Sequence, residues 1–137
     1  MKKAFIFIGD RGSGKTKFAK LALSKFEDKA VYLDGRSFNS SNFFFFNECT
    51  PKTKLIIIDG LKQDYLFHFF EDISKGEITI NKKGQKPYKV KIERFIFILD
   101  SDIVDFNNNA SFTRRFEIIR FPIVDTINLI QKIITND

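Results

Sequence analysis

The sequence is poor in cysteine and histidine. Its 137 residues include one of each and no tryptophan. Cys49 cannot form a disulfide within the chain, which is typical of proteins that fold in a reducing compartment. His68 has no cysteine or second histidine at metal-ligand spacing, so we interpret it as a packing residue rather than a zinc ligand. These absences favour a cytoplasmic protein with neither structural disulfides nor a His/Cys metal centre.

Long apolar runs are also missing. None approaches the roughly 20 residues that cross a bilayer, so we expect a soluble protein without a membrane partner. The chain opens with MKKAFIFI, whose apolar run is too short for a signal peptide and leads directly into a glycine-rich motif. Linkers and internal repeats are missing as well. We therefore expect a single domain over residues 1–137.

Acidic residues are outnumbered, with 17 against 23 basic residues and a net charge of +6. The excess is concentrated between Lys75 and Arg94, where seven basic and two acidic residues give a net charge of +5. Such a cluster indicates a polyanionic partner, although solvated charge on an exposed hairpin would produce the same pattern.

Short apolar runs alternate with helical patterns along the chain. The runs are mostly continuous, as in strands covered on both faces of a parallel sheet, and lie at 4–8, 30–33, 55–58, 95–99 and 116–121. Helical spacing of apolar residues follows at 16–26, 61–73 and 123–135. This alternation predicts an α/β fold with a five-stranded parallel sheet, right-handed crossovers and helices on both faces.

One segment breaks this alternation and predicts a β-hairpin at about residues 77–92. Apolar residues alternate on both sides of a turn that contains Gly84 and Pro87. The pattern puts Ile78, Ile80, Tyr88, Val90 and Ile92 on one face. It puts lysines on the tip (Lys82, Lys83, Lys86) and on the solvent face of the return strand (Lys89, Lys91).

The stretch GDRGSGKT, residues 9–16, matches the phosphate-binding P-loop pattern in full, directly after a predicted strand and at the start of a predicted helix. Its backbone N–H groups and the helix N-terminus attract phosphates. We expect the loop Gly9, Asp10, Arg11, Gly12, Ser13 and Gly14 to bind the phosphates of ATP. Lys15 should reach the β- and γ-phosphates, and Thr16 should be a ligand of Mg²⁺.

The stretch LIIIDG ends a strand with one acid, Asp59, followed by Gly60. Carboxylates at this edge of an α/β sheet hold Mg²⁺, so we assign Asp59 to the metal together with Thr16; a helix N-cap is the alternative role. Many ATPases carry a second acid at the next position to activate water, and losing it costs about 10²- to 10⁴-fold in rate. Of Glu48, Asp64 and Asp102, the last is best placed to substitute, because it follows the neighbouring strand in FILDSD.

Two arginines, Arg114 and Arg115, stand just before the last predicted strand. A guanidinium stabilises the charge that develops on a transferring phosphoryl group, so this pair suits a γ-phosphate across a subunit interface. Solvation at the surface is the alternative interpretation.

In this order the motifs resemble those of the superfamily 3 helicase branch of AAA+ P-loop ATPases, the motor domain of replication proteins from small viruses and plasmids. GDRGSGKT resembles its Walker A motif, LIIIDG its Walker B motif, and TRRF its arginine-finger segment. The stretch ISKGEITINKKGQKPYKVKIERFIFI resembles the region where a hairpin with a basic tip precedes the sensor strand, and LDSD stands where motif C usually ends in asparagine. The resemblance covers about residues 4–121.

The resemblance implies a P-loop NTPase fold of the ASCE/AAA+ type with sheet order 5-1-4-3-2 and the hairpin as an insertion. It also implies a hexameric ring with one ATP and Mg²⁺ at each interface, where Lys15, Asp59 and Asp102 act with Arg114 or Arg115 of the neighbouring subunit. The hairpin tips, with Lys82, Lys83 and Lys86, would contact single-stranded DNA through its phosphates.

Three departures from the family pattern bear on activity. Gly60 replaces the second acid, Asp102 replaces the sensor asparagine, and neither an origin-binding nor an oligomerisation domain precedes the P-loop. We therefore expect ATP binding, hydrolysis only if another acid substitutes, and a separate partner for origin recognition or oligomerisation.

Two other functions remain open on the sequence alone. YLDGRSF, after the second strand, resembles the segment by which some small P-loop kinases place their acceptor substrate. A kinase, however, requires an arginine-rich lid where this chain has a lysine hairpin. The other function is that of a non-hydrolysing switch that binds DNA according to nucleotide occupancy, which Gly60 favours.

Overall fold

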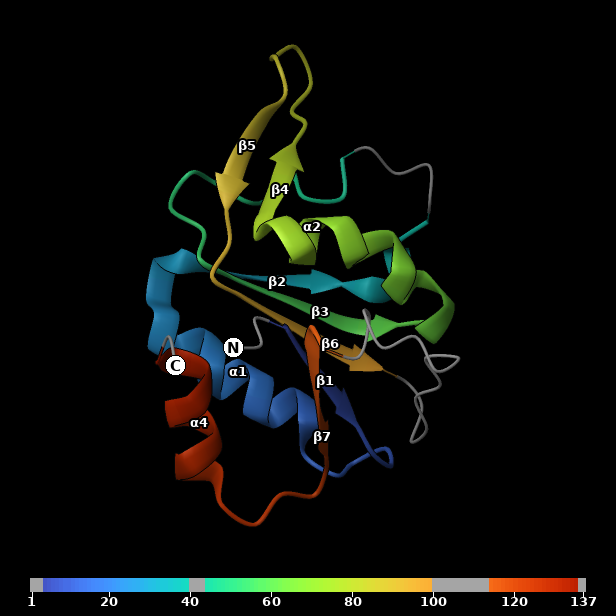
Figure 1. Ribbon diagram of the computed structural model, residues 1–137, viewed down its shortest axis with the longest axis vertical. Helices are drawn as coiled ribbons and strands as arrows, with labels where there is room; N and C mark the ends of the chain where they lie inside the picture. Colours follow the sequence, from blue (N-terminus) through green and yellow to red (C-terminus); the bar gives the residue numbers. More distant parts are fainter. Residues whose placement is uncertain (1–3, 40–43, 100–113, 136–137) are drawn as a thin grey trace.

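The computed structural model describes residues 4–39, 44–99 and 114–135. Its centre is a sheet of five parallel strands. The strands stand in the order β2-β3-β6-β1-β7, as Figure 1 shows. They are β1 (Ala4–Ile8), β2 (Ala30–Asp34), β3 (Leu55–Leu61), β6 (Arg94–Leu99) and β7 (Phe116–Arg120). Numbered among themselves along the chain and read from the β7 edge, they give 5-1-4-3-2, which confirms the predicted order.

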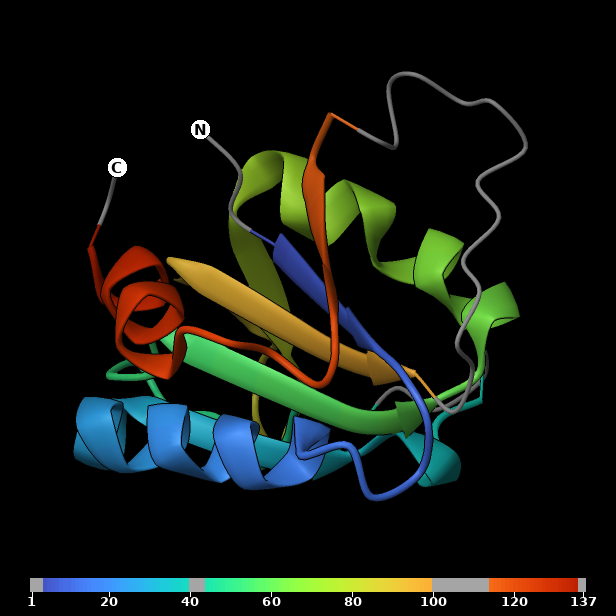
Figure 2. The same cartoon turned by 90° about the horizontal axis from the view of Figure 1, so that it is seen from below.

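Helices cover both faces of this sheet, also as predicted (Figure 2). One face carries α1 (Lys15–Phe26) and α4 (Thr126–Ile134), and the other carries the 3₁₀ helix η3 (Gln63–Phe69) and α2 (Phe70–Lys75). Every residue of β1 and β6 is buried, which explains why β1 and the part of β6 after Arg94 are continuously apolar. Phe5 and Phe7 pack with α1, whereas Ile6 and Ile8 pack toward α2 and the hairpin.

The predicted hairpin is present as β4 (Glu77–Ile80) and β5 (Tyr88–Lys91). Ile78 pairs with Val90 and Ile80 with Tyr88, so the predicted apolar residues share one face. That face is buried in the same core cluster as Ile6. Beyond this contact the hairpin projects away from the five-stranded sheet (Figure 1), so that its turn lies at the surface.

The segment predicted as one helix over residues 61–73 is divided differently. Leu61 belongs to β3, the next turns form η3, and only then does α2 begin. The buried residues explain the division: Leu66 and Phe69 are three apart, as in a 3₁₀ helix, whereas Phe69 and Ile73 are four apart, as in an α-helix.

The C-terminal helix is shorter than the predicted range of 123–135. Its N-cap is Asp125, whose side chain accepts a hydrogen bond from the backbone N–H of Asn128 at 2.9 Å, so α4 begins at Thr126. Two further 3₁₀ turns, η1 (Glu27–Lys29) and η2 (Gly35–Ser37), flank β2. Among the residues described, no helix is both long and apolar enough to cross a membrane.

Candidate functional site

The P-loop connects the end of β1 to the start of α1, as predicted. Gly9 begins it with φ +142°, and a Cβ there would lie 2.6 Å from the carbonyl oxygen of Phe121. Only glycine fits this position, because both the backbone angle and the close approach exclude a side chain. The turn directs the following backbone toward the N-terminus of α1, where N–H groups attract anions.

A cavity of about 790 Å³ opens above this loop at the carboxyl ends of the strands. It brings together every predicted phosphate- and metal-binding residue except Ser13. Its lining consists of Gly9, Asp10, Arg11, Gly12, Gly14, Lys15, Thr16, Lys17, Arg36, Asp59 and Ile98. In addition to Lys15, five of these residues have ionisable side chains. A polar cavity at this edge of the sheet suits a charged ligand.

Lys15 is held at the base of this cavity. Its side chain is buried, and its ammonium donates hydrogen bonds to the carbonyl oxygens of Gly9 at 2.5 Å and Leu99 at 3.2 Å. These two carbonyls belong to the P-loop and the end of β6, so the lysine connects the loop to the sheet. Its positive charge is thus fixed beside the loop backbone.

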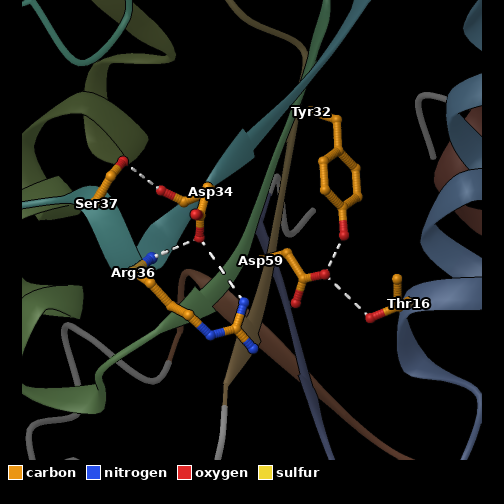
Figure 3. A network of polar contacts seen from close by, with 6 residues as sticks. All are labelled: Thr16, Tyr32, Asp34, Arg36, Ser37 and Asp59. Atoms are coloured by element: carbon orange, nitrogen blue, oxygen red, sulfur yellow. Dashed lines mark hydrogen bonds and ion pairs between the residues drawn. The ribbon is translucent and has the colours of Figure 1, made fainter.

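Asp59, on β3, lies opposite Thr16 on α1 (Figure 3). The Thr16 hydroxyl donates a hydrogen bond to Asp59 Oδ2 at 3.0 Å. The Tyr32 hydroxyl, from the neighbouring strand β2, donates to the same oxygen. Burial and then the hydrogen bond to Asp59 raise the pKa of Tyr32, so it stays a protonated donor at neutral pH. A hydroxyl and a carboxylate on facing elements form an oxygen donor set that fits Mg²⁺.

Gly60 follows Asp59 at an irregularity in the pairing of β3 with β6, with φ +83°. A Cβ at this position would lie 2.7 Å from Nη1 and 2.8 Å from Cζ of Arg36. The left-handed backbone therefore disfavours a side chain at residue 60, and the end of the Arg36 side chain fills the space that its Cβ would enter. In this fold, the place beside Asp59 where a second acid is expected is taken by an arginine.

Arg36 belongs to η2, directly after β2. The carboxylate of Asp34 accepts a hydrogen bond from the Arg36 backbone N–H at 2.9 Å, and its Oδ1 lies 3.8 Å from Nη1 (Figure 3). Asp34 pairs with Asp59 in the parallel register of β2 and β3. The sequence motifs do not predict Tyr32, Asp34 or Arg36 as residues of the phosphate and metal site, although all three lie in YLDGRSF, the segment that resembles the acceptor-binding segment of small kinases.

Of the remaining candidate acids, the two that the structure describes do not border the cavity. Glu48 and Asp64 are exposed and contribute nothing to its lining. Asp102, the acid favoured by sequence, lies outside the described residues, as do Asp100 and Ser101. Its predicted role therefore stays a prediction.

Arg114 and Arg115 stand at the other end of the sheet from the P-loop. Phe116, which follows them, pairs with Ala4 at the start of β1, whereas the P-loop follows Ile8 at its end. Four strand steps of about 3.3 Å separate the two ends, or roughly 13 Å. The Arg115 guanidinium lies over the ring of Phe70, 5.0 Å from its centroid. The structure does not bring these arginines to the cavity of their own chain.

The lysines of the hairpin differ in their surroundings. Lys83 and Lys86 are exposed on the turn, and Lys82 is half-buried. On the strands, Lys89 Nζ forms an ion pair with Glu77 Oε1 at 3.6 Å. Arg94, which the charge count included in the basic segment, is only 2% exposed and belongs to the interior. The basic surface is therefore smaller than the sequence indicated and centres on the turn.

A second cavity, of about 580 Å³, adjoins the first where Gly14 and Lys17 line both. It lies between the start of α1 and the segment after β7, and apolar side chains dominate its lining: Phe18, Leu21, Phe121, Pro122 and Ile123. Ser13 lines it too, and its buried hydroxyl makes no hydrogen bond within the described part of the chain. No sequence pattern indicated this cavity, because its two walls are far apart in the chain.

Comparison with known proteins supports the fold. No protein-family model and no curated protein matches the sequence. The crystal structure of JCV helicase bound to a thiazolopyridine compound aligns with a TM-score of 0.65 and 15% identity, over 88% of this chain and 36% of that one. Two apo structures of the NrS-1 C-terminal region align over 96% of this chain, with TM-scores of 0.60 and 0.57 and identities of 22% and 18%.

This chain covers 33% and 34% of those two NrS-1 chains, so it spans about a third of the length of all three structures. At these identities the likeness concerns the fold alone. The predicted α/β P-loop fold is confirmed by this likeness.

Proposed function

We propose that this chain, with its helicase-type P-loop fold, binds ATP and Mg²⁺ and acts as a motor domain on single-stranded DNA. The observation that carries the proposal is the convergence of the P-loop, Lys15, Thr16 and Asp59 on one polar cavity. A cavity of about 790 Å³ is large enough for a triphosphate. The predicted single P-loop ATPase domain over residues 1–137 is part of this proposal.

The residues divide the work of binding. The P-loop N–H groups and Lys15 hold the phosphates, and Thr16 and Asp59 hold Mg²⁺, which neutralises charge on the β- and γ-phosphates. Tyr32 fixes the orientation of Asp59 through its hydrogen bond. The adjoining apolar cavity suits the base and ribose, since it begins where the phosphate cavity ends.

Action on DNA and assembly into a ring are supported by two features. The exposed turn lysines Lys83 and Lys86, with Lys82, offer a contact to DNA phosphates. Arg114 and Arg115 lie at the opposite end of the sheet from their own cavity, so they would serve the site of a neighbouring subunit, as in a hexamer. The setting that we propose for this motor is the replication of a small virus, plasmid or mobile element.

A second function is favoured by one observation. Asp34, Gly35 and Arg36 stand beside the phosphate cavity, which is where a small P-loop kinase would bind its acceptor. Phosphoryl transfer to a small molecule in the absence of DNA would support this function. The observed strand order is the one that the resemblance to helicases implies, so it favours the motor domain over the kinase.

The decisive experiment is steady-state ATP hydrolysis with Mg²⁺, with and without single-stranded DNA, beside a Lys15→Ala variant. Turnover that rises with DNA and is lost in the variant is expected of a DNA-stimulated motor. ATP binding without turnover would instead indicate a nucleotide-dependent switch. A wild-type protein that binds ATP no better than Lys15→Ala would contradict both.

A further inference from the structure

We propose that Arg36 binds the terminal phosphate of the nucleotide within its own subunit, in the space that a side chain at residue 60 would otherwise fill. The inference rests on the proposed function, because it takes a nucleoside triphosphate as the ligand. It assigns a phosphate contact to η2, an element outside the P-loop and the two metal-binding residues.

The position of the guanidinium supports this role. Arg36 lines the same cavity as the P-loop and Asp59. Its guanidinium also fills the space that a Cβ at Gly60, the residue next to Asp59, would enter. Asp59 and Thr16 mark the end of the cavity where Mg²⁺ would be held, and Mg²⁺ there would neutralise charge on the terminal phosphates. The guanidinium therefore stands at the end of the cavity where the last phosphate belongs.

The chemistry of arginine fits this ligand. Its planar group presents paired N–H donors that match two phosphate oxygens, and it remains charged at any physiological pH. The side chain of Arg36 is exposed, so solvent and a ligand can reach it. Its ion pair with Asp34, at 3.8 Å, is longer than a charge-assisted hydrogen bond of about 2.8 Å. Phosphate oxygens can thus compete with Asp34 for the guanidinium.

Asp34 keeps the arginine in place during that exchange. Its carboxylate accepts the Arg36 backbone N–H at 2.9 Å, and its own carbonyl accepts the Ser37 hydroxyl at 2.8 Å. These two bonds fix the η2 turn without using the guanidinium. The backbone of Arg36 therefore stays beside Gly60 when the side chain binds a phosphate.

The consequence is discrimination between nucleoside triphosphate and diphosphate. The experiment compares the affinities of Mg²⁺ with AMP-PNP and with ADP by isothermal titration calorimetry, in wild type and Arg36→Ala. The variant should bind AMP-PNP at least about tenfold more weakly, the value of one charge-assisted hydrogen bond, and ADP within about twofold of wild type. Arg36→Lys keeps the charge but not the paired donors, so its affinity for AMP-PNP should lie between those of wild type and Arg36→Ala.

Lys62→Ala removes an exposed cation near the end of β3 that does not line the cavity, and should change neither affinity. Equal affinities in wild type and Arg36→Ala, or an equal loss for AMP-PNP and ADP, would overturn the inference alone. If wild type bound neither nucleotide better than Lys15→Ala, the proposed function would fail with it.

A second variant tests the role of Gly60. Gly60→Ala places a methyl group where the guanidinium lies and should displace it. The ratio of AMP-PNP affinity to ADP affinity should therefore fall, as it does in Arg36→Ala. In an Arg36→Ala background, Gly60→Ala should leave the ratio unchanged, because the two changes act on one contact. Additive effects on the ratio would overturn the link between the residues. Circular dichroism spectra would establish that each variant is folded.

Discussion

At the scale of single residues, Arg94 is a buried charge that holds two elements together. It is 2% exposed and donates hydrogen bonds to the carbonyls of Ile133 (3.2 Å) and Thr135 at the end of α4, and of its neighbour Glu93 (2.8 Å). We expect Arg94→Met to lower the free energy of unfolding by about 2–4 kcal/mol, because these carbonyls would lose their donor in the interior. Urea denaturation measures this change.

The control for that variant is Lys25→Met, which removes an exposed cation from α1. It should change the free energy of unfolding by less than about 0.5 kcal/mol. A similar small effect of Arg94→Met would show that its hydrogen bonds contribute little net stability.

Asp72 on α2 should make the stability depend on pH. Burial, and then the negative charge of Glu71, raise the pKa of Asp72 to about 6 from an ordinary value of 3.8. The unfolded chain therefore releases this proton more readily, and ionised Asp72 destabilises the fold above pH 6. That cost disappears as the pH falls from 6 toward 3.8.

Asp72→Asn should consequently stabilise the protein at pH 7.5, by on the order of 1 kcal/mol once solvent screening is allowed for. The gain should shrink at pH 5 and vanish near pH 4. Thermal unfolding at these three pH values gives the comparison. A gain that is constant with pH would mean that the titration of Asp72 is not its cause.

At the scale of elements, most of the fold could be predicted because local patterns and tertiary packing agree. The buried strand β1 and the part of β6 after Arg94 are continuous apolar runs, and the hairpin residues alternate with period two, which puts Ile78 and Val90 on one face. Segment 61–73 was predicted less well. Its apolar residues are compatible with either helix type, and packing of Leu66 and Phe69 on the sheet selects the tighter one.

The β4–β5 hairpin carries a prediction about DNA. Lys83→Ala with Lys86→Ala should weaken binding to single-stranded DNA uniformly across sequences, because phosphate contacts carry no sequence information. The slope of log affinity against log salt should become shallower by about 0.7 for each phosphate that the missing lysines had neutralised. Fluorescence anisotropy at several salt concentrations measures both quantities.

The matched control is Lys25→Ala with Lys29→Ala, which removes two exposed lysines from α1 and η1. If this pair reduced the salt slope as much as the hairpin pair, the binding would reflect net charge rather than the hairpin.

At the scale of the whole molecule, the site combines predictable and unpredictable parts. The P-loop and Asp59 are recognisable because their functions require a fixed local pattern. Tyr32 and Arg36 reach the site only through the pairing of β2 with β3, and no local pattern marks such a contact. Gly60 is a second case in which the sequence is insufficient. The motif LIIIDG indicates only that the second acid is missing, whereas the fold shows that Arg36 occupies the space beside Gly60.

The placement of the two arginines leads to a prediction about pairs of subunits. Arg114 and Arg115 cannot serve the cavity of their own chain, since they precede β7 at the opposite end of the sheet. In the proposed ring, they would complete a neighbour's site. A Lys15→Ala subunit and a subunit with Arg114→Ala and Arg115→Ala should therefore each lack ATP hydrolysis, while their mixture recovers it at interfaces that join one intact site to intact arginines.

Random mixing in equal amounts should restore about a quarter of the wild-type rate, because one interface in four combines the two intact parts. The control mixes Lys15→Ala with Arg36→Ala. Both residues belong to the same cavity, so no interface can combine their intact copies, and the mixture should not exceed what the Arg36→Ala subunits achieve by themselves. The proposal that one subunit provides the cavity and the next provides the arginines has two contrary outcomes. They are a recovered hydrolysis rate in this control and an absence of recovery in the first mixture.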